Sequence, residues 1–198
     1  MNEIILATNN QNKIREMKQK LSEYGIIVIS QKEAGINIDV EETGTTCREN
    51  AQIKAQAIFD ILKKPVIADD SGLYIDYLDG APGIYSHRFA GENATDLDRI
   101  NIVLERMKDA PEEKRTARFK CCICYIDKNA EKHFFEGVAE GIIGHDPCGT
   151  NGFGFDPIFH YEGDKRSFAE YSPKEKNDVS HRGQAVAKFE EFIRENGV

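Results

Sequence analysis

Two adjacent carboxylates, Asp69 and Asp70, are the clearest candidates for chemistry in this chain. They follow an apolar run at residues 66–68 and precede a Ser-Gly dipeptide, after which apolar residues alternate to residue 78. The pattern predicts a strand, an acidic turn and a second strand. Carboxylates at a strand end attract Mg²⁺, which prefers oxygen ligands. If this stretch is considered alone, an ordinary turn is the favoured interpretation, because Asp, Ser and Gly are common turn residues.

Successive side chains of an extended strand point to opposite faces, so Asp69 and Asp70 do not both face one site if the backbone stays extended. We therefore expect one of them to function and the other to be structural. Glu41 and Glu42 lie just ahead of a predicted helix and are candidate metal ligands together with Asp70. Two glutamates in a loop are, however, more often simply solvated.

A polar segment at residues 8–13 lies between a predicted strand at residues 3–7 and a predicted helix that begins near residue 14. Free backbone N–H groups and the helix dipole favour an anion at such a place, and the charge of Lys13 suits a phosphate. The segment is not a Walker A loop, because the glycines are absent. An Asn-rich turn with a solvated lysine explains it equally well.

Two further segments have unusual composition. Residues 152–157, GFGFDP, offer aromatic rings for base stacking in a backbone that can approach a ligand closely; a core strand after a turn is the plain alternative. Lys176, His181 and Arg182 gather near the start of a final helix for which Ser180 is the expected N-cap. Cations are unfavourable beside that end of the helix dipole, so an anionic or carbonyl-bearing ligand is more attractive than a structural role.

The elements that must position these residues alternate between strands and helices, which predicts an α/β fold. Helices are expected to start after Thr46 and Thr95, both typical N-caps. Long strands at residues 116–127 and 133–143 are expected to form a hairpin near Lys128. The chain length suits one domain, residues 1–198, with two lobes.

Composition excludes several classes of function. A net charge of −8 argues against nucleic acid as a partner, which requires a broad basic surface. No apolar run reaches membrane-spanning length and no signal peptide is evident, so we expect a cytoplasmic protein without a membrane partner. Cys121 and Cys124 match C-x-x-C, but on a strand they face opposite sides and cannot chelate zinc together; buried free thiols are expected.

Six segments carry a resemblance that covers the chain nearly from end to end. They are ATNNQNK (7–13), EETGTTCRENAQIKA (41–55), ADDSG (68–72), GAPGIYSHRFAG (80–91), GFGFDPIF (152–159) and KNDVSHRG (176–183). In this order they resemble the inosine/xanthosine triphosphate pyrophosphatases. The resemblance implies an elongated mixed α/β fold with a long curved mixed sheet, two lobes and a central cleft. It also implies a homodimer that uses Mg²⁺ to hydrolyse ITP, dITP and XTP to the nucleoside monophosphate and pyrophosphate.

By motif position, the resemblance assigns metal binding and activation of the attacking water to Asp70, with Glu41 or Glu42 as the second metal ligand. The substrate-binding residues fall into three groups. Thr8, Asn9, Asn10, Gln11, Asn12 and Lys13 would hold the triphosphate, Ser71 would contact the substrate, and Phe153, Gly154, Phe155, Asp156, Lys176, His181 and Arg182 would form the nucleoside pocket.

Two other functions compete with this one. A related enzyme with a different modified-base preference, for example for a pyrimidine, would share the phosphate and metal residues and differ in the base pocket. A non-catalytic nucleotide sensor would bind without turnover. For a purine pocket, Arg182 and His181 are hydrogen-bond donors that match a 6-carbonyl and oppose the 6-amino group of adenine.

Overall fold

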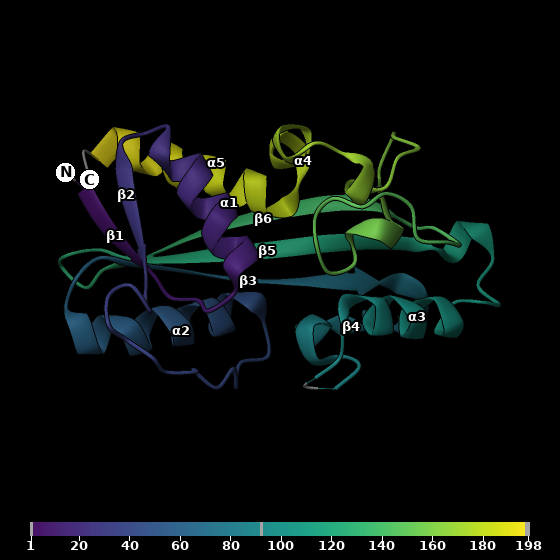
Figure 1. Ribbon diagram of the computed structural model, residues 1–198, viewed down its shortest axis with the longest axis horizontal. Coiled ribbons are helices and arrows are strands. Elements are labelled where there is room, and N and C mark those ends of the chain that lie inside the picture. Colours follow the sequence, from purple (N-terminus) through teal and green to yellow (C-terminus); the bar gives the residue numbers. More distant parts are fainter. Residues whose placement is uncertain (1, 92, 197–198) are drawn as a thin grey trace. The chain divides into compact units, whose positions relative to one another are not determined.

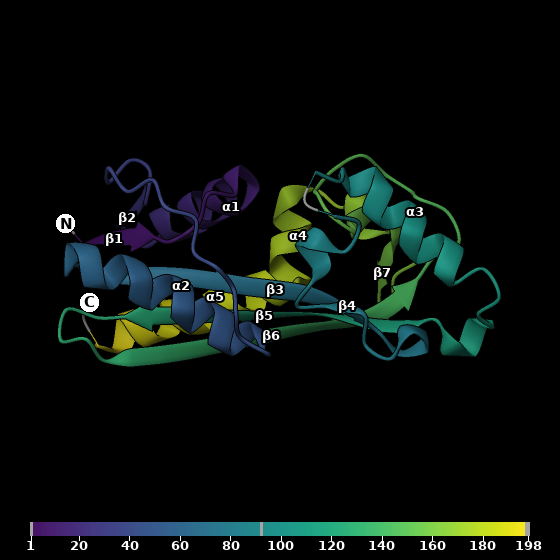
Figure 2. The same cartoon turned by 90° about the horizontal axis from the view of Figure 1, so that it is seen from below.

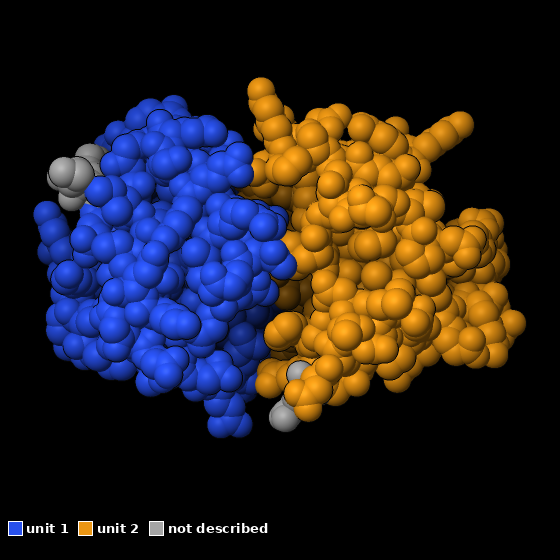
Figure 3. All heavy atoms as spheres, viewed as in Figure 1, with its two compact units in different colours: residues 1–70, 121–136, 185–198 blue, residues 71–120, 137–184 orange. Residues whose placement is uncertain are grey.

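The structure, a computed structural model, describes residues 2–91 and 93–196. The chain divides into two compact units, shown in different colours in Figure 3. Unit 1 comprises residues 1–70, 121–136 and 185–198, and unit 2 comprises residues 71–120 and 137–184. The expected single domain stays a prediction.

Unit 1 is a sheet covered by helices on both faces. Its strands lie in the order β2 (Ile26–Ser30), β1 (Asn2–Leu6), β3 (Val66–Ile75), β5 (Thr116–Ile126) and β6 (Lys132–Ile143), of which β3, β5 and β6 continue into unit 2. Strand β1 pairs in parallel with both β2 and β3. Helices α1 (Gln11–Ser22) and α5 (His181–Asn196) lie on one face, and α2 (Cys47–Leu62) lies on the other (Figures 1 and 2).

The alternation of the strands assigns their side chains to the two faces of unit 1. Ile4 of β1 and Ile67 of β3 pack with apolar residues of α1 and α5. Ile5 and Ala68 pack instead with the apolar residues of α2. Both faces of the central strands are therefore buried, as expected for parallel strands between helices.

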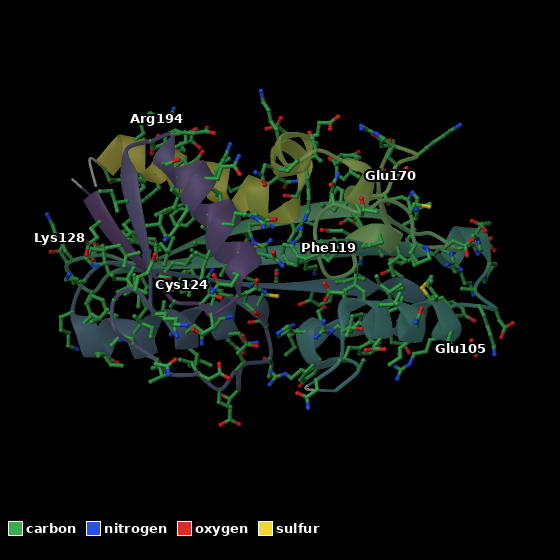
Figure 4. The ribbon with its side chains drawn as sticks, in the orientation of Figure 1. Glu105, Phe119, Cys124, Lys128, Glu170 and Arg194 are labelled. Carbon is green, nitrogen blue, oxygen red and sulfur yellow. The ribbon has the colours of Figure 1, made fainter. Side chains whose placement is uncertain are left out.

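Unit 2 contains the second part of β3, which pairs antiparallel with β4 (Pro82–Gly83), and the end of β6, which pairs antiparallel with β7 (Phe159–Tyr161). Its helices are α3 (Asp96–Arg106), α4 (Pro173–Val179) and the first residues of α5. Short 3-10 helices η1 (Asp76–Leu78), η2 (Ser86–Arg88), η3 (Glu112–Lys114), η4 (Asp156–Ile158) and η5 (Phe168–Glu170) complete the unit. In its core the ring of Phe119, labelled in Figure 4, lies tilted against Phe159 and stacks with Phe168.

Most of the predicted elements are confirmed. The fold is α/β with a mixed sheet, and Thr46 and Thr95 cap α2 and α3. Strands β5 and β6 are neighbours joined by the turn that contains Lys128 (Figure 4). The cysteines of β5 are buried free thiols. In the part of the chain that the structure describes, no helix has the length and apolar character needed to cross a membrane.

The predicted acidic turn is wrong, because β3 runs without interruption from Val66 through both aspartates to Ile75. The local residue types favour a turn, but the strand pairs with β1 at its start and with β4 near its end, lies beside β5, and is buried on both faces. Gly72 serves close packing here, since a Cβ at this position would lie 2.2 Å from the carbonyl oxygen of Gly83 in β4. The strand also ends three residues earlier than predicted, where η1 begins.

Helix α4 was not predicted from the sequence. Ser172 accepts a hydrogen bond from the backbone N–H of Glu175, and the Glu175 carboxylate accepts one from the backbone N–H of Ser172. Pro173 occupies the first helical position, where its missing N–H costs nothing. The signals of a helix start were therefore present in the sequence, but seven residues are too few to show a helical period.

Replacing Gly72 with alanine tests the close contact between β3 and β4. We expect Gly72→Ala to lower the free energy of unfolding by about 1–3 kcal/mol, because the added methyl group must push backbone apart. Urea unfolding followed by circular dichroism measures the change. A loss no larger than that of an ordinary surface substitution, about 0.5 kcal/mol, would contradict the packing described here.

Candidate functional site

The alternation of β3 places Asp69 and Asp70 on opposite faces of unit 1, as predicted. The Asp69 side chain is fully buried and its Oδ2 lies 3.0 Å from Nζ of Lys13, on α1. The Asp70 carboxylate is nearly buried and its Oδ1 lies 3.1 Å from Nζ of Lys54, on α2. Each carboxylate is therefore paired with a lysine from the helix that covers its own face.

Lys54 joins Asp70 to one of the two candidate glutamates. Its Nζ lies 2.6 Å from Oε1 of Glu42, whereas the neighbouring Glu41 is exposed. Nδ2 of Asn50, one helical turn before Lys54, lies 3.5 Å from Oδ2 of Asp70. Two carboxylates thus share one ammonium group, and of the two glutamates it is Glu42 that lies beside Asp70.

Burial and charge act in opposite directions on this cluster. Burial raises the pKa of Asp70 above its ordinary value, although the ammonium groups of Lys54 and Lys13 oppose the shift. Burial lowers the pKa of Lys54, but the negative charges of Asp70 and Glu42 outweigh it and leave that pKa above its ordinary value. Lys54 therefore stays protonated, and Asp70 is a stronger base than an exposed aspartate.

The polar segment at residues 8–13 spans the turn into α1, where Asn10 is the N-cap. Its Oδ1 accepts hydrogen bonds from the backbone N–H groups of Asn12 and Lys13, at 2.9 and 3.2 Å. The expectation of free N–H groups at this helix start is therefore wrong for these two residues, because the asparagine side chain already satisfies them. Phosphate binding by this segment would rely on the Lys13 charge, or on displacement of the cap.

The other residues of this segment hold the turn in place. Oγ1 of Thr8 accepts a hydrogen bond from the backbone N–H of Asn10. The Asn9 side chain bonds to the Gln31 side chain and to the Ile38 carbonyl. The Asn12 side chain accepts a hydrogen bond from Arg15, and Gln11 is exposed as the first residue of α1. Of the predicted phosphate ligands, Lys13 is the one that the structure brings beside a carboxylate of β3.

Unit 2 contains a second buried charge pair. Nζ of Lys176, in the last turn of α4, lies 2.6 Å from Oδ2 of Asp156, and both side chains are almost fully buried. The same Oδ2 accepts the backbone N–H of Phe153 at 2.8 Å. Asp156 therefore fixes both the lysine and the loop that carries the Phe153 ring, and the ring centroid lies 4.8 Å from Nζ of Lys176.

His181 and Arg182 begin α5 and are both buried. The His181 ring stacks on Phe119, with centroids 4.6 Å apart and planes 11° apart. Nη2 of Arg182 donates to Oγ of Ser71 at 3.1 Å, and its guanidinium carbon lies 5.6 Å from the Phe153 ring centroid. Unit 2 thus brings together two cations, an aromatic ring and a hydroxyl among the predicted substrate-binding residues.

Phe155 differs from the other predicted pocket residues, because its side chain is buried in the apolar core of unit 2. Any ligand contact of Phe155 would come from its backbone. Gly154 lies between the two phenylalanines with a φ of +64°, and its N–H donates to Oδ2 of Asp96 at 2.7 Å. Phe153 is therefore the aromatic ring of this segment that lies beside the cations.

Sequence reasoning missed Lys54, Asn50 and Asp96. Asn50 and Lys54 are four residues apart on α2 and thus share a face of a helix that is otherwise apolar where it packs. That pair of polar residues on a packing face was a usable signal. Asp96 gave none, because an acidic residue in the first turn of a helix is ordinary.

The buried pair of Lys176 and Asp156 leads to a stability prediction. We expect Lys176→Met to lower the free energy of unfolding by about 3–5 kcal/mol, because it leaves a buried carboxylate without its cation. The matched control is Lys63→Met, which removes the exposed pair with Asp60 at 3.0 Å and should leave stability nearly unchanged. Chemical unfolding of both variants measures the difference. Equal losses would show that burial of the first pair has no energetic consequence.

Comparison with known proteins gives one consistent relationship. The chain is 45% identical to the dITP/XTP pyrophosphatase of Halalkalibacterium halodurans over 98% of this chain and 100% of that protein, and 43% identical to the dITP/XTP pyrophosphatase of Escherichia coli K12 over 98% and 99%. The structure of a HAM1 protein from Coxiella burnetii, 44% identical, superposes with a TM-score of 0.90 over 98% of this chain and 100% of that one. Residues 4–192 match the pattern of the Ham1 family, and the chain therefore belongs to the Ham1 family.

Proposed function

We propose that this enzyme, a nucleoside triphosphate pyrophosphatase, hydrolyses ITP, dITP and XTP to the nucleoside monophosphate and pyrophosphate with Mg²⁺ as cofactor. The chain matches relatives named dITP/XTP pyrophosphatase over nearly their full length, and these matches support the reaction and the substrates. The observation that carries the proposal is the pair of carboxylates, Asp70 and Glu42, that share Lys54.

The residues of unit 1 suit a metal and a triphosphate. Asp70 and Glu42 supply carboxylate oxygens, which are the ligands that Mg²⁺ takes together with substrate phosphates. The ammonium group of Lys54 lies within ion-pair distance of both carboxylates, and this supports a place for positive charge beside them. Mg²⁺, when bound there, would stabilise negative charge on the phosphate oxygens. We therefore assign the metal to Asp70 and Glu42 and leave Glu41 out.

Side chains of unit 1 would carry out proton transfer and stabilise the charge of the phosphates. We assign to Asp70 the further role of accepting a proton from the water that attacks the α-phosphorus. Lys13 supplies a positive charge to the phosphates, and such a charge stabilises the transition state most where the surroundings exclude water. Asp69 pairs with Lys13 and so orients it. These roles divide the two aspartates into one that acts on the reaction and one that positions a lysine.

The residues of unit 2 suit a purine base with a 6-carbonyl. The Phe153 ring offers a stacking surface, and Arg182 offers N–H donors close to it. Adenine carries an amino donor at position 6, so donors would face donors in a buried pocket, at a cost of about 1–3 kcal/mol for each unsatisfied group. This mismatch supports preference for ITP and XTP over ATP. Guanine carries the 6-carbonyl too, and this argument does not explain how GTP is rejected.

The direct test is release of pyrophosphate. Purified protein with ITP and Mg²⁺ should produce pyrophosphate and IMP, and removal of the metal with EDTA should abolish the reaction. The matched variants are Asp70→Asn, expected to lower kcat roughly hundredfold or more, and Asp69→Asn, expected to have the smaller effect. Circular dichroism verifies that both are folded. Binding of ITP without turnover would identify a sensor, and turnover of modified pyrimidine nucleotides alone would identify the other enzyme class.

Replacing Arg182 tests the assignment of base recognition. We expect Arg182→Ala to lower kcat/KM for ITP and to reduce the ITP/ATP ratio of kcat/KM about tenfold, since one donor to the 6-carbonyl is lost. The matched control is Arg166→Ala, an exposed arginine of unit 2 that pairs with Asp164. Steady-state kinetics with both nucleotides decide the question. An unchanged ratio in Arg182→Ala would remove this arginine from base recognition.

A homodimer, implied by the resemblance, and a cytoplasmic location, expected from the sequence, remain predictions for this chain. Membership of the Ham1 family supports the homodimer.

A further inference from the structure

We propose that Asp96, at the start of α3, is a positioning residue for Phe153 and thereby for the base of the substrate. The inference rests on the proposed function, in which the Phe153 ring stacks on a purine. Asp96 lies outside the charged clusters described above, and α3 contributes no residue to either of them.

The loop that carries Phe153 is held at two consecutive amides. The N–H of Phe153 donates to Asp156 at 2.8 Å, and the N–H of Gly154 donates to Oδ2 of Asp96 at 2.7 Å. The two carboxylates come from different elements, η4 and α3. Together they fix the peptide planes on both sides of the Phe153 Cα atom, and so fix the direction of its side chain.

This loop needs such anchors because of its glycines. Gly152 and Gly154 flank Phe153 with φ values of +76° and +64°. Glycine loses more conformational freedom on ordering than any other residue, so a segment with two of them populates many conformations unless contacts select one. A hydrogen bond from an amide to a carboxylate is among the stronger contacts available for that purpose.

Asp96 is itself held firmly. Its Oδ1 accepts from Nη1 of Arg99 at 2.6 Å, and Nε of Arg99 donates to the carbonyl of His87 at 2.7 Å. The Arg99 side chain is almost fully buried. Asp96 also lies in the first turn of α3, where the helix dipole stabilises a negative charge. The carboxylate therefore presents Oδ2 to Gly154 from a fixed position.

The ring held in this way lies beside two buried cations. Its centroid is 4.8 Å from Nζ of Lys176 and 5.6 Å from the guanidinium carbon of Arg182. If the Gly154 amide is released, the peptide that follows Phe153 loses its anchor, although Asp156 and the bonds of Asn151 to Ala169 and Tyr171 still hold the start of the loop. The ring can then leave these positions. Loss of Asp96 should therefore weaken binding of the base while leaving the residues that act on the phosphates unchanged.

The experiment compares Asp96→Ala with Asp98→Ala. Asp98 is the matched control because it lies in the same helical turn, carries the same charge and accepts hydrogen bonds from Thr95 at the cap, without contact to the loop. We expect Asp96→Ala to raise KM for ITP about fivefold to fiftyfold with kcat changed less than about twofold, since the lost contact affects ground state and transition state alike. Asp98→Ala should show near-wild-type KM. Asp96→Asn, which keeps a carbonyl oxygen for Gly154, should recover part of the loss.

A second measurement needs no substrate. Amide hydrogen exchange followed by NMR should show faster exchange at Gly154 in Asp96→Ala than in wild type or Asp98→Ala. An unchanged KM, or an equal rise in the Asp98 variant, would overturn the inference. If wild-type protein releases no pyrophosphate from ITP, the proposed function fails and the role toward substrate fails with it. In that case, faster amide exchange at Gly154 in Asp96→Ala would still show that the contact between Asp96 and Gly154 is correct and that only the proposed function is wrong.

Discussion

Burial of two neighbouring carboxylates on a central strand is the constraint on which unit 1 depends. An ionised carboxylate that loses water without gaining a partner costs several kcal/mol, so neither Asp69 nor Asp70 tolerates burial alone. Strand alternation sends them to opposite faces, and each face is covered by a helix that supplies a lysine. The helices are therefore positioned by charge compensation as well as by apolar packing, and the candidate site residues are assembled by the same contacts that make the burial possible.

Unit 2 also buries a carboxylate, and different elements compensate its charge. Asp156 is buried, and Lys176 together with the backbone N–H of Phe153 compensates its charge. The lysine comes from the short helix α4, which is followed at once by α5. Gly183 allows this tight junction, because a Cβ there would lie 1.7 Å from the carbonyl oxygen of Asn177. Lys176 and Arg182, on the two sides of this junction, are both buried, and they lose water there while their hydrogen bonds become strong.

Sequence reasoning found the strands, the long helices and most of the residues that gather in the two clusters, because hydrophobic period and capping residues are local signals. It failed where distant contacts decide. The Asp-Ser-Gly stretch of β3 has turn-forming residues, yet it is extended within a strand that pairs with β1 before it and with β4 after it. The choice between Glu41 and Glu42 depends on the reach of Lys54 from α2. Asp96 has no signal in its own neighbourhood, since its partner is 58 residues away.

The thiols of β5 have a consequence for handling and monitoring this protein. Burial raises the pKa of Cys122 and of Cys124 to about 12, so almost no reactive thiolate exists at neutral pH. Cys47 and Cys121 are buried too, and Cys148 alone among the five cysteines is exposed. The folded chain therefore offers one sulfur to an alkylating reagent, and the unfolded chain offers five. The number of labels on each molecule, read by mass spectrometry, reports how much of the population has opened, without any probe being added to the sequence.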